Sequence, residues 1–458
     1  MEQRALIEDE GAEVTAQRRQ ALREQRAAEA SSAPPRVIAA CRDQVELQPV
    51  DLDSLIAVEH RARAVWEMVD RLDLSRFYAV IKARGSTAGR STTDPKVLVA
   101  LWLYATADGV VHARELERLC REHNVYRWLR GGVPVNYHTL SDFRTAQWEA
   151  LDELLTQVLA VLMEQGLVRL RRVAQDGTRV RASAGSRSFR RHAKLQECLT
   201  AARAHLAALA EQATTPATVT SGTARQQAAR VRAAREREQR IERALGALKE
   251  VQADRAASKP GSHDPQTPPR GSTTDPDARK MRMGDGGYRP AYNAQFATDT
   301  ASGVIVGVAV SQSRTDFGEA PPMIQQIEER TGRRPEELVV DTGFTSREAV
   351  EEISAAGVTL YGALPQRKGK PDPYAPQKAD SAAMQALKTR MSSEVGRAIY
   401  RERWAVAEGV NADLKTWRGL QRFVVRGTSK VLCIALLNAL AFNILRWLSL
   451  TSTSVTRT

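Results

Sequence analysis

Cysteine is scarce in this sequence. Its 458 residues include four cysteines, none of them in a CxxC motif: Cys41, Cys120, Cys198 and Cys433. Disulfide frameworks and structural zinc sites are built from closely spaced cysteine pairs, so the sequence predicts neither. Cys120 and His123 form a lone CxxH motif, and no second pair follows to complete a zinc site. A reducing cytoplasm is therefore the expected location.

The sequence predicts neither a signal peptide nor a nucleotide-binding loop. Its first residues, MEQRALIEDEGAEV, contain no apolar core of signal-peptide length, so secretion is not expected. The glycine-rich residues Gly284–Gly287 have no Walker lysine, no serine or threonine after it and no apolar strand before them. A turn is the prediction there.

One long apolar segment is present, Val431–Leu450. It is long enough to span a bilayer. However, it contains Asn438, Asn443 and Arg446, and a basic stretch directly precedes it. These polar residues favour a core helix over a membrane span, and no membrane partner is expected.

Charge is plentiful and unbalanced. Lysine and arginine number 67 against 54 aspartates and glutamates, which gives a net charge of +13 and an isoelectric point of about 9.8. This balance favours a polyanionic partner, and nucleic acid fits best. A chain of this length can form two or three domains.

The chain is predicted to begin with a flexible or helical tail, residues 1–45, followed by a helical domain of DNA-binding type over residues 46–167. Apolar-periodic segments in this domain are separated by glycine, proline or asparagine. Its short helices and tight turns resemble a helix-turn-helix, in which Thr139 or Ser141 caps a helix that presents Arg144 to DNA. Short amphipathic helices are equally typical of ordinary bundles, so both interpretations stay open.

Strand and helix patterns alternate over residues 168–450. A strand within Arg171–Ser183 precedes a helical hairpin and a Pro- and Gly-rich loop at about 188–282, which we interpret as an insertion. Two strands follow, and then helix, strand, helix, strand and helix. This order predicts an α/β fold with a mixed sheet flanked by helices. Residues 451–458 are expected to be a tail.

Three acids from distant elements lie in apolar surroundings. Asp176 is on the first strand, Asp341 ends the fourth strand, and Glu408 is on a late helix. Clustered carboxylates bind hard divalent ions such as Mg²⁺, which support phosphodiester chemistry. Local roles are the alternatives: Asp176 could cap the turn at Gly177, and Asp341 the helix beginning near Ser346. Glu408 could pair within its own helix.

Four motifs extend this pattern: VAQDGTRVRASAGSRSFRR, STTDPDARKMRMGDGGYRPAYNAQFATDTASGVIVGV, VVDTGF, and IYRERWAVAEGVNADLKTWRGLQRFVVRG followed by LNALAFNILR. Together they resemble the DDE transposases of bacterial insertion sequences over about residues 50–448. The resemblance implies a ribonuclease-H-like core whose catalytic and metal-binding residues are Asp176, Asp341 and Glu408, with two Mg²⁺ ions that Mn²⁺ can replace. It also implies that Lys415, seven residues after Glu408, is catalytic and contacts substrate phosphate.

The sequence departs from this family at one point. Related enzymes often show a tyrosine, two residues, an arginine, three residues and then the glutamate. Here Arg403 is five residues before Glu408, and Tyr400 is eight before it. The roles of this tyrosine and arginine are therefore left unassigned.

The resemblance implies metal-dependent hydrolysis at the ends of the element, followed by attack of the 3′-hydroxyls on target DNA. The implied partners are double-stranded element ends and target DNA, bound by a homodimer at the nucleoid in the bacterial cytoplasm. A catalytically silent DNA-binding regulator and a nuclease of related fold are the alternatives. Nine arginines are expected to provide DNA contacts: Arg144, Arg179, Arg181, Arg187, Arg190, Arg191, Arg418, Arg422 and Arg426.

Overall fold

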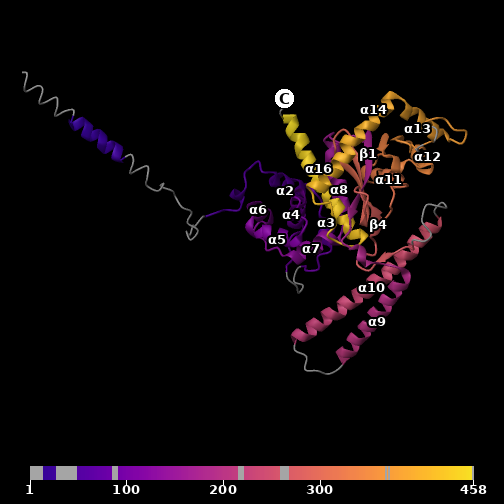
Figure 1. The fold of residues 1–458 in the computed structure, drawn as a ribbon, viewed down its shortest axis with the longest axis horizontal. Helices are drawn as coiled ribbons and strands as arrows, with labels where there is room; N and C mark the ends of the chain where they lie inside the picture. Colours follow the sequence, from indigo (N-terminus) through magenta and orange to yellow (C-terminus); the bar gives the residue numbers. More distant parts are fainter. Residues whose placement is uncertain are drawn as a thin grey trace, which may run out of the picture. The chain divides into compact units, whose positions relative to one another are not determined.

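The computed structural model describes residues 14–26, 49–84, 91–214, 221–257, 268–366, 369 and 372–455. The chain forms two compact units, Met1–Val50 and Asp51–Thr458. The described part of the first unit contains a helix over residues 14–26 with exposed side chains. All elements below belong to the second unit (Figure 1).

A helical region opens the second unit. The central helix α4 begins where Asp94 accepts a hydrogen bond from the Lys96 amide and Pro95 occupies the first turn. Every residue of α4 except Lys96 is buried, so neighbouring helices surround it. α7 and α8 are separated at Gln147, whose backbone is not helical. The helices of this region are α2 (Arg61–Arg71), α3 (Ser75–Ala79), α4 (Pro95–Ala107), α5 (Ala113–Glu122), α6 (Asn124–Arg130), α7 (Tyr137–Ala146) and α8 (Trp148–Glu164).

A mixed six-stranded sheet follows. Its strand order is β4-β5-β1-β7-β8, and β6 also pairs with β5. β1 is antiparallel to β5 and parallel to β7, and β8 is parallel to β7. The predicted mixed sheet is therefore observed, with β4 as an additional strand. Its strands are β1 (Arg172–Arg181), β4 (Arg279–Arg282), β5 (Tyr288–Asp299), β6 (Ile305–Ser311), β7 (Glu337–Val340) and β8 (Thr359–Gly362).

Helices pack around this sheet and link it to the helical region. One continuous hydrophobic core includes Trp102 of α4, Leu155 of α8 and Phe296 of β5. Residues Gly284–Gly287 form the turn between β4 and β5, as predicted, with the Gly287 amide bonded to Asp285. The helices of this part are α11 (Ala320–Thr331), α12 (Arg347–Ala355), α13 (Ala382–Ser392), α14 (Glu394–Arg403), α15 (Gly409–Thr416) and α16 (Thr428–Val455).

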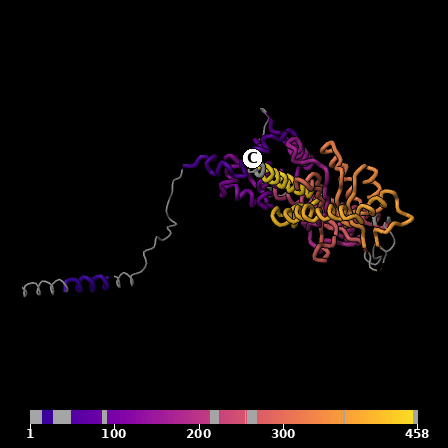
Figure 2. Tube along the Cα trace, turned by 90° about the horizontal axis from the view of Figure 1, so that it is seen from above, coloured from indigo at the N-terminus to yellow at the C-terminus, as the bar shows by residue number. Residues whose placement is uncertain are grey.

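Helix α16 contains the long apolar segment. It packs against α4, α8 and β6, and Figure 1 and Figure 2 show this yellow helix between the helical region and the strands. It is the one described helix long and apolar enough to cross a membrane, and 67% of its most apolar window is buried inside the protein. Asn443 donates to the Ile305 carbonyl and accepts from the Ile305 amide, so this polar side chain joins α16 to β6. The helix continues to Val455, into the predicted tail, and residues 456–458 lie outside the described residues.

The predicted helical hairpin is present between β1 and β4. α9 (His192–Thr214) and α10 (Ser221–Ala257) lie side by side (Figure 1) and enclose a small separate core that includes Leu195, Ile241 and Leu248. At its base, β2 (Phe189–Arg190) pairs with β3 (Gly271–Ser272). The hairpin therefore has its own packing and joins the sheet through two short strands.

The described cysteines are free thiols. They are Cys120, Cys198 and Cys433, and Cys41 lies outside the described residues. Burial raises the pKa of Cys120 to about 12, and His123 accepts a hydrogen bond from the Val125 amide at the start of α6. The CxxH motif thus serves helix packing and capping.

Candidate active site

The register of the sheet brings two of the predicted acids together. The parallel pairing of β1 with β7 ends at Gln175 and Val340, so Asp176 and Asp341 are the next residues of the two strands. Neighbouring strands lie about 4.8 Å apart. The two carboxylates are close enough that the charge of Asp341 raises the pKa of Asp176.

Each aspartate also bonds to the backbone that follows it. Asp176 Oδ1 accepts from the Gly177 amide at 2.9 Å. Asp341 accepts from the Gly343 amide and opens the short helix η3 (Thr342–Phe344), while α12 is capped separately by Ser346. These local bonds use one oxygen of each carboxylate and fix its orientation.

A long helix brings Glu408 toward the same strand. α14 continues without a break through a π-helical turn (η4, Trp404–Glu408) into α15. Asn411 Nδ2 donates to Asp176 Oδ2 at 3.1 Å. The Arg403 guanidinium lies between the two acids, with Nη2 2.8 Å from Glu408 Oε1 and Nη1 3.8 Å from Asp176 Oδ2. Asp176 and Glu408 therefore share one positive partner.

Burial dominates the electrostatics of this site. It raises the pKa of Asp176 to about 6, with the Arg403 charge opposing the shift and the Asp341 charge adding to it. Burial also lowers the pKa of the Lys415 ammonium, and the Asp176 carboxylate opposes that shift. Lys415 thus lies within the electrostatic field of Asp176.

The donor atoms of the site suit a divalent cation. In the described ranges, no three carboxylate, imidazole or thiolate side chains already converge on one point. The Asp176 carboxylate is largely buried, however, and the adjacent Asn411 Oδ1 is buried without a hydrogen-bond partner. Carboxylate and amide oxygens are ligands that Mg²⁺ and Mn²⁺ accept. The residues present therefore fit such an ion.

Six of the arginines expected to contact DNA have exposed side chains. Two parts of the chain come together at the end of β1, because the Phe423 amide donates to the Arg181 carbonyl at 2.8 Å. Arg426 Nε also donates to the Ser183 carbonyl at 3.1 Å. Basic side chains from both parts of the chain therefore lie near the C-terminal end of β1, the strand that contains Asp176. The exposed arginines are Arg181, Arg187, Arg190, Arg191, Arg422 and Arg426.

Two other arginines are engaged inside the protein. Arg144 is 7% exposed, its guanidinium lies 4.5 Å from the centroid of the Trp102 ring, and it donates to the Val111 carbonyl. Arg418 donates to Asp413 at 3.0 Å and to the last carbonyl of α4. The buried position of Arg144 does not support its expected DNA contact, since the guanidinium instead stabilises the helical region.

Two polar residues near the aspartates were not predicted. Asn411 follows Glu408 by three residues, a spacing that places both on one helical face and could have identified it. Asp316 lies in the loop between β6 and α11 and pairs with Arg179, with 2.9 Å between Oδ2 and Nη1. No periodicity or motif spacing marks Asp316 in the sequence.

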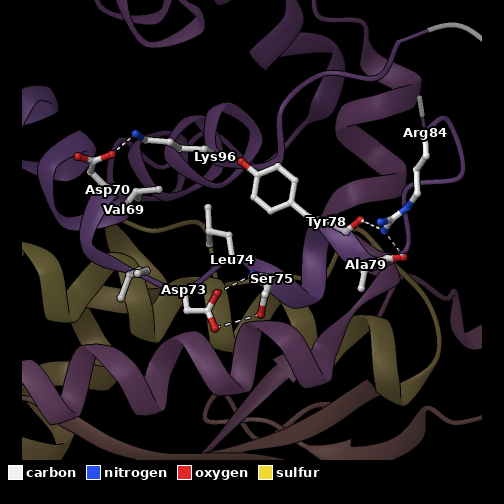
Figure 3. Close-up of a pocket in the computed structure, with 10 residues that line it drawn as sticks. Val69, Asp70, Asp73, Leu74, Ser75, Tyr78, Ala79, Arg84 and Lys96 are labelled. Atoms are coloured by element: carbon white, nitrogen blue, oxygen red, sulfur yellow. Dashed lines mark hydrogen bonds and ion pairs between the residues drawn. The ribbon is translucent and has the colours of Figure 1, made fainter. Parts of the chain in front are cut away.

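A hollow of about 670 Å³ lies elsewhere, in the helical region. Figure 3 shows that its charged side chains have partners: Lys96 pairs with Asp70, and Arg84 donates to backbone carbonyls. None of the three predicted acids lines this hollow. The candidate active site therefore lies on the central strand β1 at Asp176, next to the end of β7.

Comparison with known protein families found two matches in this chain. Residues 261–444 match the family described as "Transposase DDE domain", and residues 50–146 match "Transposase domain (DUF772)". The first match includes Asp341 and Glu408 and begins after Asp176. No curated protein and no solved structure matches the chain.

A DDE domain implies a ribonuclease-H-like fold, so the predicted fold class is confirmed. Proteins of this family act on DNA and generally use divalent metal ions. The two matches cover most of the helical region and most of the sheet. The chain is an insertion-sequence transposase of the DDE type.

Proposed function

We propose that this transposase cleaves DNA at the ends of its insertion sequence and joins the freed ends to target DNA. The observation that supports the proposal is the meeting of Asp176 and Asp341 at one sheet edge, where the helix with Glu408 packs through Asn411. Acids that converge from distant elements suit phosphodiester chemistry, in which cations must offset the charge of the phosphate.

Each polar residue has a role in this proposal. Asp176, Asp341 and Glu408 would hold two divalent cations, Mg²⁺ or Mn²⁺. When bound, such cations activate a water or hydroxyl nucleophile and stabilise the leaving oxygen. Arg403 balances the charge of Asp176 and Glu408 in the metal-free protein. Lys415 would contact a phosphate oxygen of the substrate.

The first reaction would give a 3′-hydroxyl at each end of the element, and the second would be direct attack of that hydroxyl on target DNA. Two ends must be joined, so we expect two protomers in the DNA complex. The exposed arginines around the end of β1 would bind phosphates and fix the DNA relative to Asp176. The expected place of action is the nucleoid in the bacterial cytoplasm.

The experiment is cleavage and strand transfer with labelled DNA that carries the sequences flanking this gene, in Mg²⁺. Glu408→Gln keeps the shape of the side chain and removes its charge. We expect it to lose more than about 100-fold in cleavage rate, since loss of an outer-shell group alone typically costs 10–100-fold. Glu402→Gln is the matched control, because Glu402 lies in the same helix but pairs with Arg172 at 2.5 Å.

Three outcomes separate the possible functions. Metal-dependent 3′-end cleavage and joining that vanish in Glu408→Gln support transposition. Binding of the ends by the wild type without cleavage would favour a silent regulator. Cleavage that needs neither the element ends nor a joining step would favour a nuclease of related fold.

A further inference from the structure

Asp316 is an acid that the proposed mechanism does not use, and its carboxylate is held by three side chains of the sheet. Oδ1 accepts from Asn293 and Gln295 of β5, both at 2.7 Å, and from Arg179 of β1 at 3.1 Å. Oδ2 accepts from the same Arg179 nitrogen at 2.9 Å. The side chain is 13% exposed. Such a set of donors fixes a carboxylate far more firmly than a surface loop requires.

Two glycines lie beside the Asp316 carboxylate. A methyl group on Gly177, the residue after Asp176, would collide with Asp316 Oδ1. A methyl group on Gly343, in the turn after Asp341, would lie 3.0 Å from Asp341 Oδ1 and 3.4 Å from Asp316 Oδ2. The Asp316 carboxylate therefore fills the space beside Gly177, after Asp176, and lies near Gly343, after Asp341.

The position of Asp316 matters because the strand ladder ends there. The last β1–β7 pair is Gln175 with Val340, so no ladder hydrogen bond of these two strands fixes the distance between the next residues. Arg179 adds a bond from Nη2 to the Arg314 carbonyl at 3.0 Å, which secures the Asp316 loop to β1. Beyond the ladder, Asp316 is thus a side chain that lies next to both Gly177 and Gly343.

We propose that Asp316 is a positioning residue that holds Asp176 and Asp341 at the separation needed to bind divalent cations. The inference rests on the proposed function only in treating these two aspartates as cation ligands. Asp316 itself is occupied by Arg179, Asn293 and Gln295 and is not assigned as a ligand. Its negative charge near Asp176 also contributes to the raised pKa of Asp176.

The test is the affinity of the DNA-free protein for Mn²⁺, measured by calorimetry. Asp316→Ala removes all four bonds, and we expect at least a tenfold loss of affinity, the range found for groups that orient metal ligands. Asp316→Asn keeps an oxygen for the three donors at Oδ1, so its loss should be smaller. Asp380→Asn is the matched control, because Asp380 is also a well-bonded acid, held by Lys388 at 2.7 Å and by the Gln377 amide at 2.8 Å.

The outcomes decide the proposal. A loss of Mn²⁺ affinity in Asp316→Ala, a smaller one in Asp316→Asn and none in Asp380→Asn support it. Wild-type affinity in Asp316→Ala overturns it, and so does an equal loss in Asp380→Asn or the absence of Mn²⁺ binding by the wild type. DNA cleavage by the wild type is measured separately, so a failure of the transposition chemistry is distinguished from a failure of the positioning role. If Asp316→Ala does not fold, the Mn²⁺ affinities of Asp316→Asn and Asp380→Asn are compared instead. A loss of affinity in Asp316→Asn alone supports the proposal, and equal affinities overturn it.

Discussion

The raised pKa of Asp176 predicts that its removal stabilises the metal-free protein. A shift of the pKa from the ordinary value of 3.8 to about 6 corresponds to about 3 kcal/mol of unfavourable free energy for the ionised side chain in the folded state. Asp176→Asn removes that charge. Its oxygen can still accept from the Gly177 amide, and its new NH₂ group can donate to the unpaired Asn411 Oδ1 if the Asn411 amide turns over.

The sign of the pH dependence follows from proton binding. Between pH 3.8 and about 6 the folded wild type holds a proton on Asp176 that the unfolded chain releases. The wild type therefore loses stability as the pH rises through this window. The stability gain of Asp176→Asn should be complete above about pH 6 and absent below about pH 4.

Urea unfolding in EDTA measures this gain. At pH 8 the midpoint of Asp176→Asn should rise by about 1 M, if the slope is about 3 kcal/mol per molar urea, and the difference should close at pH 4. Asp380→Asn is the control of opposite sign, because the bond from Lys388 lowers the pKa of Asp380, and its removal should destabilise the protein at pH 8. Equal stability of the wild type and Asp176→Asn at pH 8, or a gain that persists at pH 4, would refute the reasoning.

The remaining predictions concern Arg403, Arg422, Arg418 and the π-helical turn. Arg403→Ala removes a charge that lowers the pKa of Asp176, so the acid limb of the cleavage rate against pH should move to higher pH; an unmoved limb would contradict the contact. Arg422→Ala should weaken DNA binding and reduce the slope of log affinity against log salt by about one ion. Arg418→Ala should instead lower the stability, because Arg418 donates to Asp413 and to α4, and a changed salt slope with normal stability would contradict this. Deletion of Ala405 should convert the π-helical turn into regular α-helix, and DNA cleavage should remain measurable. Deletion of Asp413, outside the turn, should abolish cleavage. An equal loss of cleavage activity in the two deletion variants would count against the role of the turn.

The sequence predicted the parts of the fold that local patterns encode. The apolar residues before Asp341 identified β7, and the polar residues within the long apolar segment identified a core helix. Both predictions succeeded because the spacing and composition of apolar residues indicate which segments are buried. The proximity of Asp176 and Asp341 followed because β1 contains Asp176 and the neighbouring strand β7 ends directly before Asp341. Strand β4 was missed because its four residues lie between a Pro-rich loop and a glycine turn. Helix α13 was also absent from the predicted order, although Ser381 caps it.

Residues that act through long-range contacts could not be predicted in this way. Asp316 lies in a loop, and its importance comes from donors more than 20 residues earlier in the chain. Arg144 and Arg418 were expected to contact DNA, but Trp102 and Asp413 provide partners that no local pattern reveals. The side chains that hold a site together are therefore harder to find in a sequence than those that form it.

The π-helical turn accounts for the unusual spacing before Glu408. In a regular α-helix, residues five apart point about 140° away from each other, so Arg403 could not reach Glu408. A turn with i to i+5 geometry realigns them, and the observed distance of 2.8 Å between Nη2 and Oε1 follows. The Tyr400 ring remains stacked near Arg403, 5.8 Å from its guanidinium. The departure from the family spacing is thus equivalent to one inserted residue, which the turn absorbs so that Arg403 still contacts Tyr400, Glu408 and Asp176.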